Sequence, residues 1–80
     1  NSQVADELLT IRNIKASFVA GRNDYGKTVV SARSLGDINV QLVMEKFGGG
    51  GHLNTAGTQV DIPPEDILMK IREKINEKNS

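Results

Sequence analysis

The sequence predicts an α+β domain in which helices pack on a small mixed sheet. In the first half of the chain, two neighbouring stretches alternate apolar and polar residues at period two, which is typical of strands. In three other stretches, apolar residues recur at helical spacing. The predicted order is therefore α-β-β-α-β-α, with a sheet made of one hairpin and one further strand. Eighty residues suit a single domain, residues 1–80, near the lower size limit for a stable core.

The N-terminal half is predicted to hold one helix and the hairpin. A helix is expected over residues 2–11, because Val4, Leu8 and Ile11 fall at positions i, i+4 and i+7. A strand over residues 14–20 follows. Its core-facing residues are Ile14, Ala16, Phe18 and Ala20. Residues 22–26 have the composition of a turn, and residues 27–35 form the returning strand, with Val30 and Ala32 facing the core.

The C-terminal half is predicted to alternate helix, strand and helix. After Gly36, Asp37 or Asn39 can cap a second helix. Its buried stripe consists of Val40, Val43, Met44 and Phe47. Residues 58–62 are predicted as the third strand, and the prolines at 63–64 open the last helix. The buried face of that helix consists of Ile67, Leu68, Ile71 and Ile75. The polar residues 76–80 are expected to fray.

Composition excludes several classes of function. Ten basic residues balance ten acidic ones, so the chain lacks the positive charge expected of a protein that binds a long nucleic acid duplex. No apolar run approaches the roughly 20 residues of a membrane span. The sequence contains no cysteine and needs no disulfide. Because the chain begins at Asn1 and a helical pattern starts almost at once, we expect it to be part of a longer protein.

Four consecutive glycines, residues 48–51, precede the chain's single histidine, His52. One interpretation is a nest of main-chain N–H groups that binds an anion. The other is a helix stop with Gly48 at the C′ position. The partial negative charge at a helix C-terminus repels phosphate, so an anion here would need Arg33 or the start of a short turn at residues 54–57.

Arg33 and His52 each have an ordinary interpretation as well. Arg33 lies at the end of a predicted strand, where its planar guanidinium suits phosphate, but taken alone it is equally a solvated edge residue. His52 suits a hydrogen bond or a stacked base, or is simply exposed. Metal binding by His52 is excluded within these residues, because the sequence has no cysteine, no second histidine and no local carboxylate cluster.

Taken together, the stretch SARSLGDINVQLVMEKFGGGGHLNTAG resembles the C-terminal DHH-associated domain of the DHH-family phosphoesterases. The shared pattern is an Arg-Ser pair ending a strand, a Gly-Asp step into a helix, a GGGGH exit and an Ala-Gly step. The resemblance covers residues 14–62. The sequence around this pattern is most similar to that of the membrane-anchored cyclic-di-AMP phosphodiesterases of Gram-positive bacteria.

The resemblance implies that this domain holds a nucleotide while a separate DHH domain of the same protein, carrying manganese, cleaves the phosphodiester. It implies no catalytic and no metal-binding residue within this chain, so the chain alone is expected not to hydrolyse substrate. The residues it assigns to substrate are Arg33, Ser34, Gly48, Gly49, Gly50, Gly51, His52, Asn54, Thr55 and Ala56. Thr55 departs from the alanine of many relatives, which narrows the pocket and adds a hydroxyl.

The partners implied are a cyclic dinucleotide or a short linear oligonucleotide, and the DHH domain. The chain is expected to be a cytoplasmic domain of a protein anchored in the bacterial membrane, and a homodimer of that protein is a further expectation. Two alternatives stay open: a substrate-binding domain of an oligoribonuclease or pAp phosphatase of the same superfamily, and an RNA-binding module such as that of alanyl-tRNA synthetases. The zero net charge argues against the RNA-binding module.

Overall fold

The computed structural model describes residues 6–36 and 38–78, with side chains up to residue 76. Over these residues the structure has five strands and two α-helices, with one short 3₁₀ helix between the first two strands. Their bounds are β1 (Glu7–Ile11), η1 (Arg12–Ile14), β2 (Ala16–Arg22), β3 (Thr28–Ser34), α1 (Val40–Glu45), β4 (Gly50–Gly51), β5 (Thr55–Val60) and α2 (Pro64–Lys78). Neither α-helix has the length and apolar character needed to cross a membrane.

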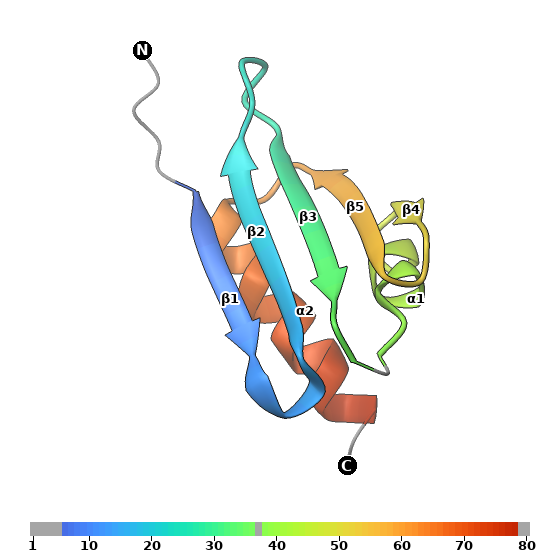
Figure 1. The fold of residues 1–80 in the computed structure, drawn as a ribbon. Coiled ribbons are helices and arrows are strands. Elements are labelled where there is room, and N and C mark those ends of the chain that lie inside the picture. The colour runs from blue at the N-terminus through green and yellow to red at the C-terminus, as the bar shows by residue number, and fades with distance from the viewer. Residues whose placement is uncertain (1–5, 37, 79–80) are drawn as a thin grey trace.

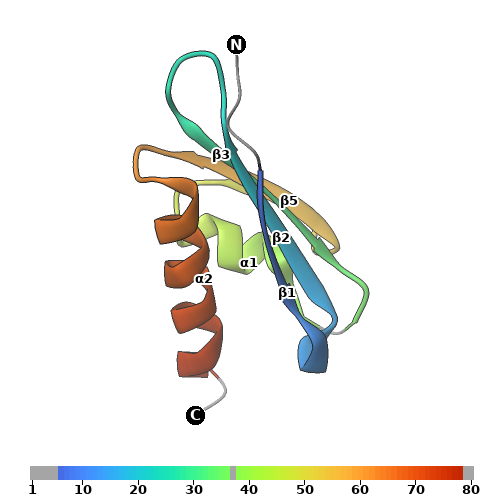
Figure 2. The same ribbon diagram turned by 90° about the vertical axis from the view of Figure 1, so that its left-hand side faces the viewer.

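The strands form one sheet in the order β1-β2-β3-β5-β4, and every neighbouring pair is antiparallel (Figure 1). Both helices lie on the same side of this sheet (Figure 2). α2 packs behind β1, β2 and β3, whereas α1 packs behind β3, β5 and β4. Among the described residues, the opposite face of the sheet has no covering layer, and we call it the open face.

The core lies between the sheet and the helices, where the sequence pattern predicts it. β3 alternates strictly between buried and exposed residues, and Val30 and Ala32 are both buried. The predicted stripes of the second and last helices point into the same core. Its buried apolar residues are Ala16, Phe18, Ala20, Val30, Ala32, Val40, Val43, Met44, Ile67, Leu68, Ile71 and Ile75. Burial of this apolar surface is the main favourable contribution to folding.

The α+β class is confirmed, but the first predicted element is wrong. Residues 7–11 form strand β1 and pair with β2 through Leu9 opposite Phe18, instead of continuing a helix from residue 2. Residues 1–5, and Val4 with them, lie outside the described residues. Pairing in the sheet overrides the helical spacing, because β1 gives the main chain of β2 a partner on its otherwise open side. The sheet is also antiparallel throughout, where a mixed sheet was expected.

Other boundaries shift by a few residues. The third predicted strand begins at Thr55 and ends at Val60, ahead of the expected residues 58–62. Asn39 is the N-cap of α1, and its side chain accepts hydrogen bonds from the N–H groups of Gln41 and Leu42. Asp37, the other candidate cap, lies outside the described residues.

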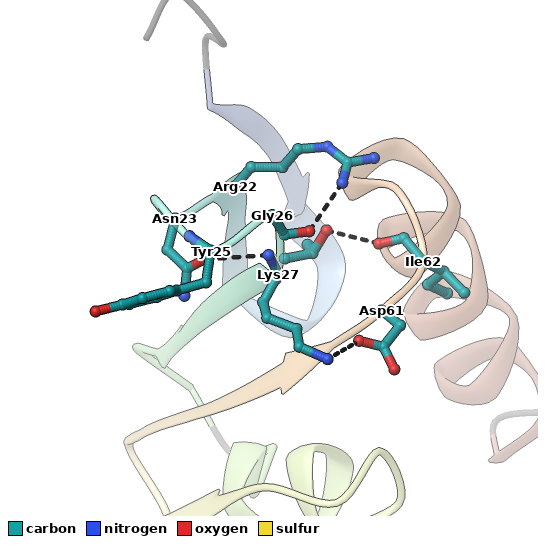
Figure 3. A network of polar contacts seen from close by, with 8 residues as sticks. Arg22, Asn23, Tyr25, Gly26, Lys27, Asp61 and Ile62 are labelled. Carbon is teal, nitrogen blue, oxygen red and sulfur yellow. Dashed lines mark hydrogen bonds and ion pairs between the residues drawn. The ribbon is translucent and has the colours of Figure 1, made fainter. Parts of the chain in front are cut away.

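The β2–β3 turn is fixed by its own side chains (Figure 3). Asn23 Oδ1 accepts hydrogen bonds from the N–H groups of Tyr25 and Lys27, at 2.9 and 3.1 Å. Lys27 pairs with Asp61, beyond β5. The Thr28 hydroxyl donates to the Ile62 carbonyl at 2.6 Å, so the turn end of the hairpin is joined to the segment between β5 and α2. This end of β3 is the one distant from Arg33.

Candidate functional site

The first two glycines of residues 48–51 end helix α1. Gly48 has a φ of +86°, and its N–H donates to the Glu45 carbonyl at 3.1 Å. The Gly49 N–H donates to the Met44 carbonyl at 2.9 Å. These two bonds form a Schellman motif, which satisfies carbonyls left free at a helix end. The helix-stop interpretation is therefore correct for Gly48 and Gly49.

The positions of Gly49 and Gly51 require glycine for a further reason: the main chain there lies very close to β5. A Cβ atom on Gly49 would lie 2.5 Å from Thr58 Cβ. One on Gly51 would lie 2.6 Å from Ala56 Cα, and Gly51 also has a φ of +142°. A larger residue at either position would force the two strands apart.

Gly50 is different, because nothing in the described fold requires a glycine there. Its φ lies outside the left-handed region, and a Cβ atom would meet no atom within 4 Å. Its partner in the sheet is Gly57. Since Gly49 and Gly51 face Thr58 and Ala56 on the helix side, the alternation of strands puts Gly50 and Gly57 on the open face. Together they leave a strip of bare main chain there.

Arg33 lies on the same open face, in a row of polar side chains. The sheet register places Arg33 between Ser17 of β2 and Thr55 of β5. In the next row, Ser31 lies between Val19 and Gly57. A shallow hollow of about 460 Å³ is found here. Its lining residues are Ser17, Val19, Ser31, Ala32, Arg33, Thr55 and Ala56.

The electrostatic character of this hollow comes from Arg33. It is the one charged residue in the lining, and its guanidinium makes no hydrogen bond or ion pair with any residue that the structure describes. Hydroxyl groups of Ser17, Ser31 and Thr55 surround it. A guanidinium with free donors beside neutral hydroxyls suits an oxyanion such as a phosphate.

The family model described as the DHHA1 domain matches residues 2–80. The chain belongs to the DHHA1 domain family. Over 77 residues this DHHA1 domain is 46% identical to the cyclic-di-AMP phosphodiesterase GdpP of Geobacillus thermodenitrificans and 43% identical to GdpP of Bacillus subtilis. Over 73 residues it is 51% identical to the cyclic-di-AMP phosphodiesterase PdeA of Listeria monocytogenes. These alignments cover 91 to 95% of this chain but only 10 to 12% of the relatives, so the chain spans about a tenth of their length.

The DHHA1 domain places Ser34 away from the hollow. Ser34 is 4% exposed and lies on the helix side of β3. Its Oγ is 3.3 Å from both the N–H nitrogen and the carbonyl oxygen of Gly36, and its own N–H donates to the Asn54 carbonyl at 2.8 Å. Ser34 therefore supports the loop that follows Arg33. Ala56 lines the hollow, although strand alternation turns its side chain toward the helices.

His52 and Asn54 belong to the turn between β4 and β5. The His52 N–H donates to the Thr55 carbonyl at 2.7 Å, whereas its imidazole is exposed and unbonded to the described residues. The Leu53 carbonyl accepts from the Val40 N–H at 3.1 Å. The short turn expected at residues 54–57 is not formed, because Thr55 already belongs to β5. With the N–H groups of Gly48, Gly49 and His52 all bonded internally, the predicted nest lacks these three donors.

Four residues of the open face were not among the predicted site residues: Ser17, Val19, Ser31 and Gly57. Each of these residues is small or medium in size and has no distinctive chemistry of its own. The register sets Ser17 beside Arg33 and Gly57 beside Gly50, whereas Ser31 shares the face of Arg33 because it lies two residues before it in β3. Over residues 6–36 and 38–78, no three His, Asp or Glu side chains gather in a way that could hold a metal ion.

Proposed function

We propose that this DHHA1 domain holds the nucleotide substrate of a phosphodiesterase that acts on cyclic-di-AMP. The names of its relatives support this substrate, since the domain is 43 to 51% identical to segments of cyclic-di-AMP phosphodiesterases. That likeness favours a cyclic dinucleotide over the oligoribonucleotides and RNA considered above. In this proposal, bond cleavage belongs to another part of the parent protein, where a DHH domain with manganese is expected.

The observation that carries the proposal is the free guanidinium of Arg33 in an otherwise uncharged hollow. Cyclic-di-AMP has two phosphodiester groups, and a planar guanidinium can donate two parallel hydrogen bonds to one of them. Thr55 and Ser17, on either side of Arg33, offer hydroxyls to the same phosphate or to a ribose.

The bare strip at Gly50 and Gly57 completes the proposed site. A flat base can lie against main chain only where no Cβ atom intervenes, and Gly50 meets that condition. Val19 adds an apolar contact in the neighbouring row. His52 extends from the adjoining turn, where its imidazole is available to stack on a base or to donate a hydrogen bond.

We extend the proposal to the setting of the domain. The resemblance of the sequence to membrane-anchored phosphodiesterases supports a parent protein that is anchored in the membrane and keeps this domain on the cytoplasmic side. The open face would then turn toward the DHH domain, with substrate between the two.

Arg33→Lys tests the site directly. The change keeps the charge but removes the paired donors, so we expect binding to weaken by about 1–3 kcal/mol, the range for charge-assisted hydrogen bonds. The measurements are titrations of the ¹⁵N-labelled domain with cyclic-di-AMP, and hydrolysis by Bacillus subtilis GdpP carrying this domain in place of its matching segment. Arg72→Lys, on the exposed side of α2, is the matched control and should behave as the parent.

Two outcomes would count against the proposal. If Arg33→Lys bound and turned over cyclic-di-AMP as well as Arg72→Lys, Arg33 would be an ordinary surface residue. If Arg33→Lys instead lowered the melting temperature of the domain by many degrees, its role would be structural.

A further inference from the structure

A second, larger hollow lies at the end of the sheet opposite the β2–β3 turn. It measures about 560 Å³ and is bordered by η1, the β3–α1 loop, α1 and the last turns of α2. It shares no lining residue with the hollow around Arg33. We call it the basic groove, and its defining residues are Ile14, Lys15, Leu35, Leu42, Lys46 and Ile75.

The groove exposes apolar surface next to the core. Leu35 is 81% exposed and Leu42 is 46% exposed, although both line the groove. Beneath them, Ile75 is buried in the core. Clustered exposed leucines over an apolar floor are typical of a surface that a partner covers, whereas single exposed leucines need no explanation.

The rim of the groove is positive. Lys15, Lys46 and Lys74 line it, and no Asp or Glu does so among the residues that the structure describes. Asp37 lies outside the described residues. The amino groups of Lys15 and Lys46 make no hydrogen bond or ion pair with described residues. The groove therefore offers two free cationic groups among its apolar lining side chains.

Lys15 adds a backbone observation. It has φ 54° and ψ 46°, and it is the one described residue other than glycine with a positive φ. This conformation costs an L-residue about 1–2 kcal/mol, whereas glycine would adopt it freely. The Lys15 carbonyl accepts the Leu35 N–H at 2.8 Å, which fixes the lysine beside the exposed leucine. Placing a lysine side chain at the groove from this position therefore costs conformational free energy that a glycine would not.

We propose that the basic groove docks an acidic amphipathic peptide segment of a partner protein. Apolar side chains of the segment pack between Leu35 and Leu42, and flanking carboxylates pair with Lys15 and Lys46. Charge complementarity selects this occupant. A nucleotide fits less well, because the described lining contains neither an aromatic ring nor an arginine. A flat bilayer fits less well, because the surface is concave.

The test uses an acidic probe peptide of about 18 residues, made of Glu, Ala and helix-spaced Leu, and a counterpart with Lys in place of Glu. Each is titrated into the ¹⁵N-labelled chain. We expect the acidic peptide to shift amide signals at residues 13–15, 35–36, 38–42 and 46, and the basic peptide to leave them unchanged. Equal shifts with both peptides, or none with either, would overturn the proposal.

Charge reversal at the rim supplies the matched comparison. Lys46→Glu should bind the acidic peptide about fivefold more weakly, as expected for an exposed ion pair, and should gain affinity for the basic one. Arg72→Glu changes the net charge equally but lies outside the groove, so its affinities should stay at the parental values. Leu42→Ser should weaken binding of the acidic peptide in the parent background and of the basic peptide in the Lys46→Glu background.

Two further titrations distinguish other occupants. Vesicles of phosphatidylcholine and phosphatidylglycerol that shifted the groove signals more strongly than the peptide would assign the groove to a membrane surface. Cyclic-di-AMP that shifted the groove signals in preference to those around Arg33 would assign it to nucleotide. Either result would contradict docking of a peptide. A melting curve of each variant serves as the control that its fold is intact.

Discussion

Gly48 has a φ of +86°, Gly49 lies against Thr58, and neither constraint applies to Gly50. Gly49→Ala should therefore destabilise the domain by about 2–3 kcal/mol, since a Cβ atom would overlap β5. Gly50→Ala should change stability by no more than about 0.5 kcal/mol. Urea unfolding of the two variants measures both effects. If both lost the same stability, the distinction between the two glycines would be wrong.

Gly50 is consequently the residue that best separates fold from ligand binding. Gly50→Val should fold well, because valine suits a strand and meets free space. The same side chain would fill the bare strip on the open face, so we expect nucleotide binding to fall by at least about tenfold. Titration with cyclic-di-AMP gives the answer. Parental affinity in Gly50→Val would leave residues 48–51 with structural roles alone.

At the scale of elements, α1 depends on its ends because it has only six residues. Asn39 caps its start. Just after its end, the Thr58 hydroxyl donates a hydrogen bond to the Phe47 carbonyl at 2.9 Å. Asn39→Ala should cost about 1 kcal/mol, whereas Asn39→Asp should retain most of the stability. Gln41→Ala, at a half-buried position of the same helix that leaves the cap in place, is the control and should be nearly neutral. Chemical denaturation measures the stability of the three variants. An equal loss in Asn39→Ala and Gln41→Ala would show that the cap is unimportant.

At the scale of the molecule, a single core between one face of the sheet and two helices supports the whole domain. A domain of this size has a total stability of only about 4–12 kcal/mol. Ile71 of α2 is fully buried, so Ile71→Ala should remove about 2–5 kcal/mol. Met69, on the same helix but 60% exposed, should tolerate alanine almost without loss. Thermal and urea unfolding compare the pair, and similar losses would contradict this division of the helix.

The same scale explains which features the sequence could predict. The core stripes of β2, β3, α1 and α2 follow from local periodicity, because each residue's burial is set by its own element. β1 was predicted as a helix because Leu8 and Ile11 also fit helical spacing, and pairing with β2 decided otherwise. The GGGGH segment and Arg33 carry distinctive chemistry, so they could be selected as site residues. Their neighbour Ser17 depends on the register of separate strands, which no local pattern encodes.

The turn that carries His52 is held by main-chain bonds alone in the contacts described: Ser34 to Asn54, Val40 to Leu53, and His52 to Thr55. Every amino acid except proline supplies the N–H and carbonyl groups that such bonds need. The side chains of Leu53 and Asn54, both exposed, are therefore free to vary while the turn keeps its shape. This separation of shape from side-chain identity makes the turn adaptable: in the proposed nucleotide site, substitutions there would alter which nucleotide is preferred without cost to folding. A library randomised at these two positions should consequently yield mostly folded proteins with a spread of ligand preferences.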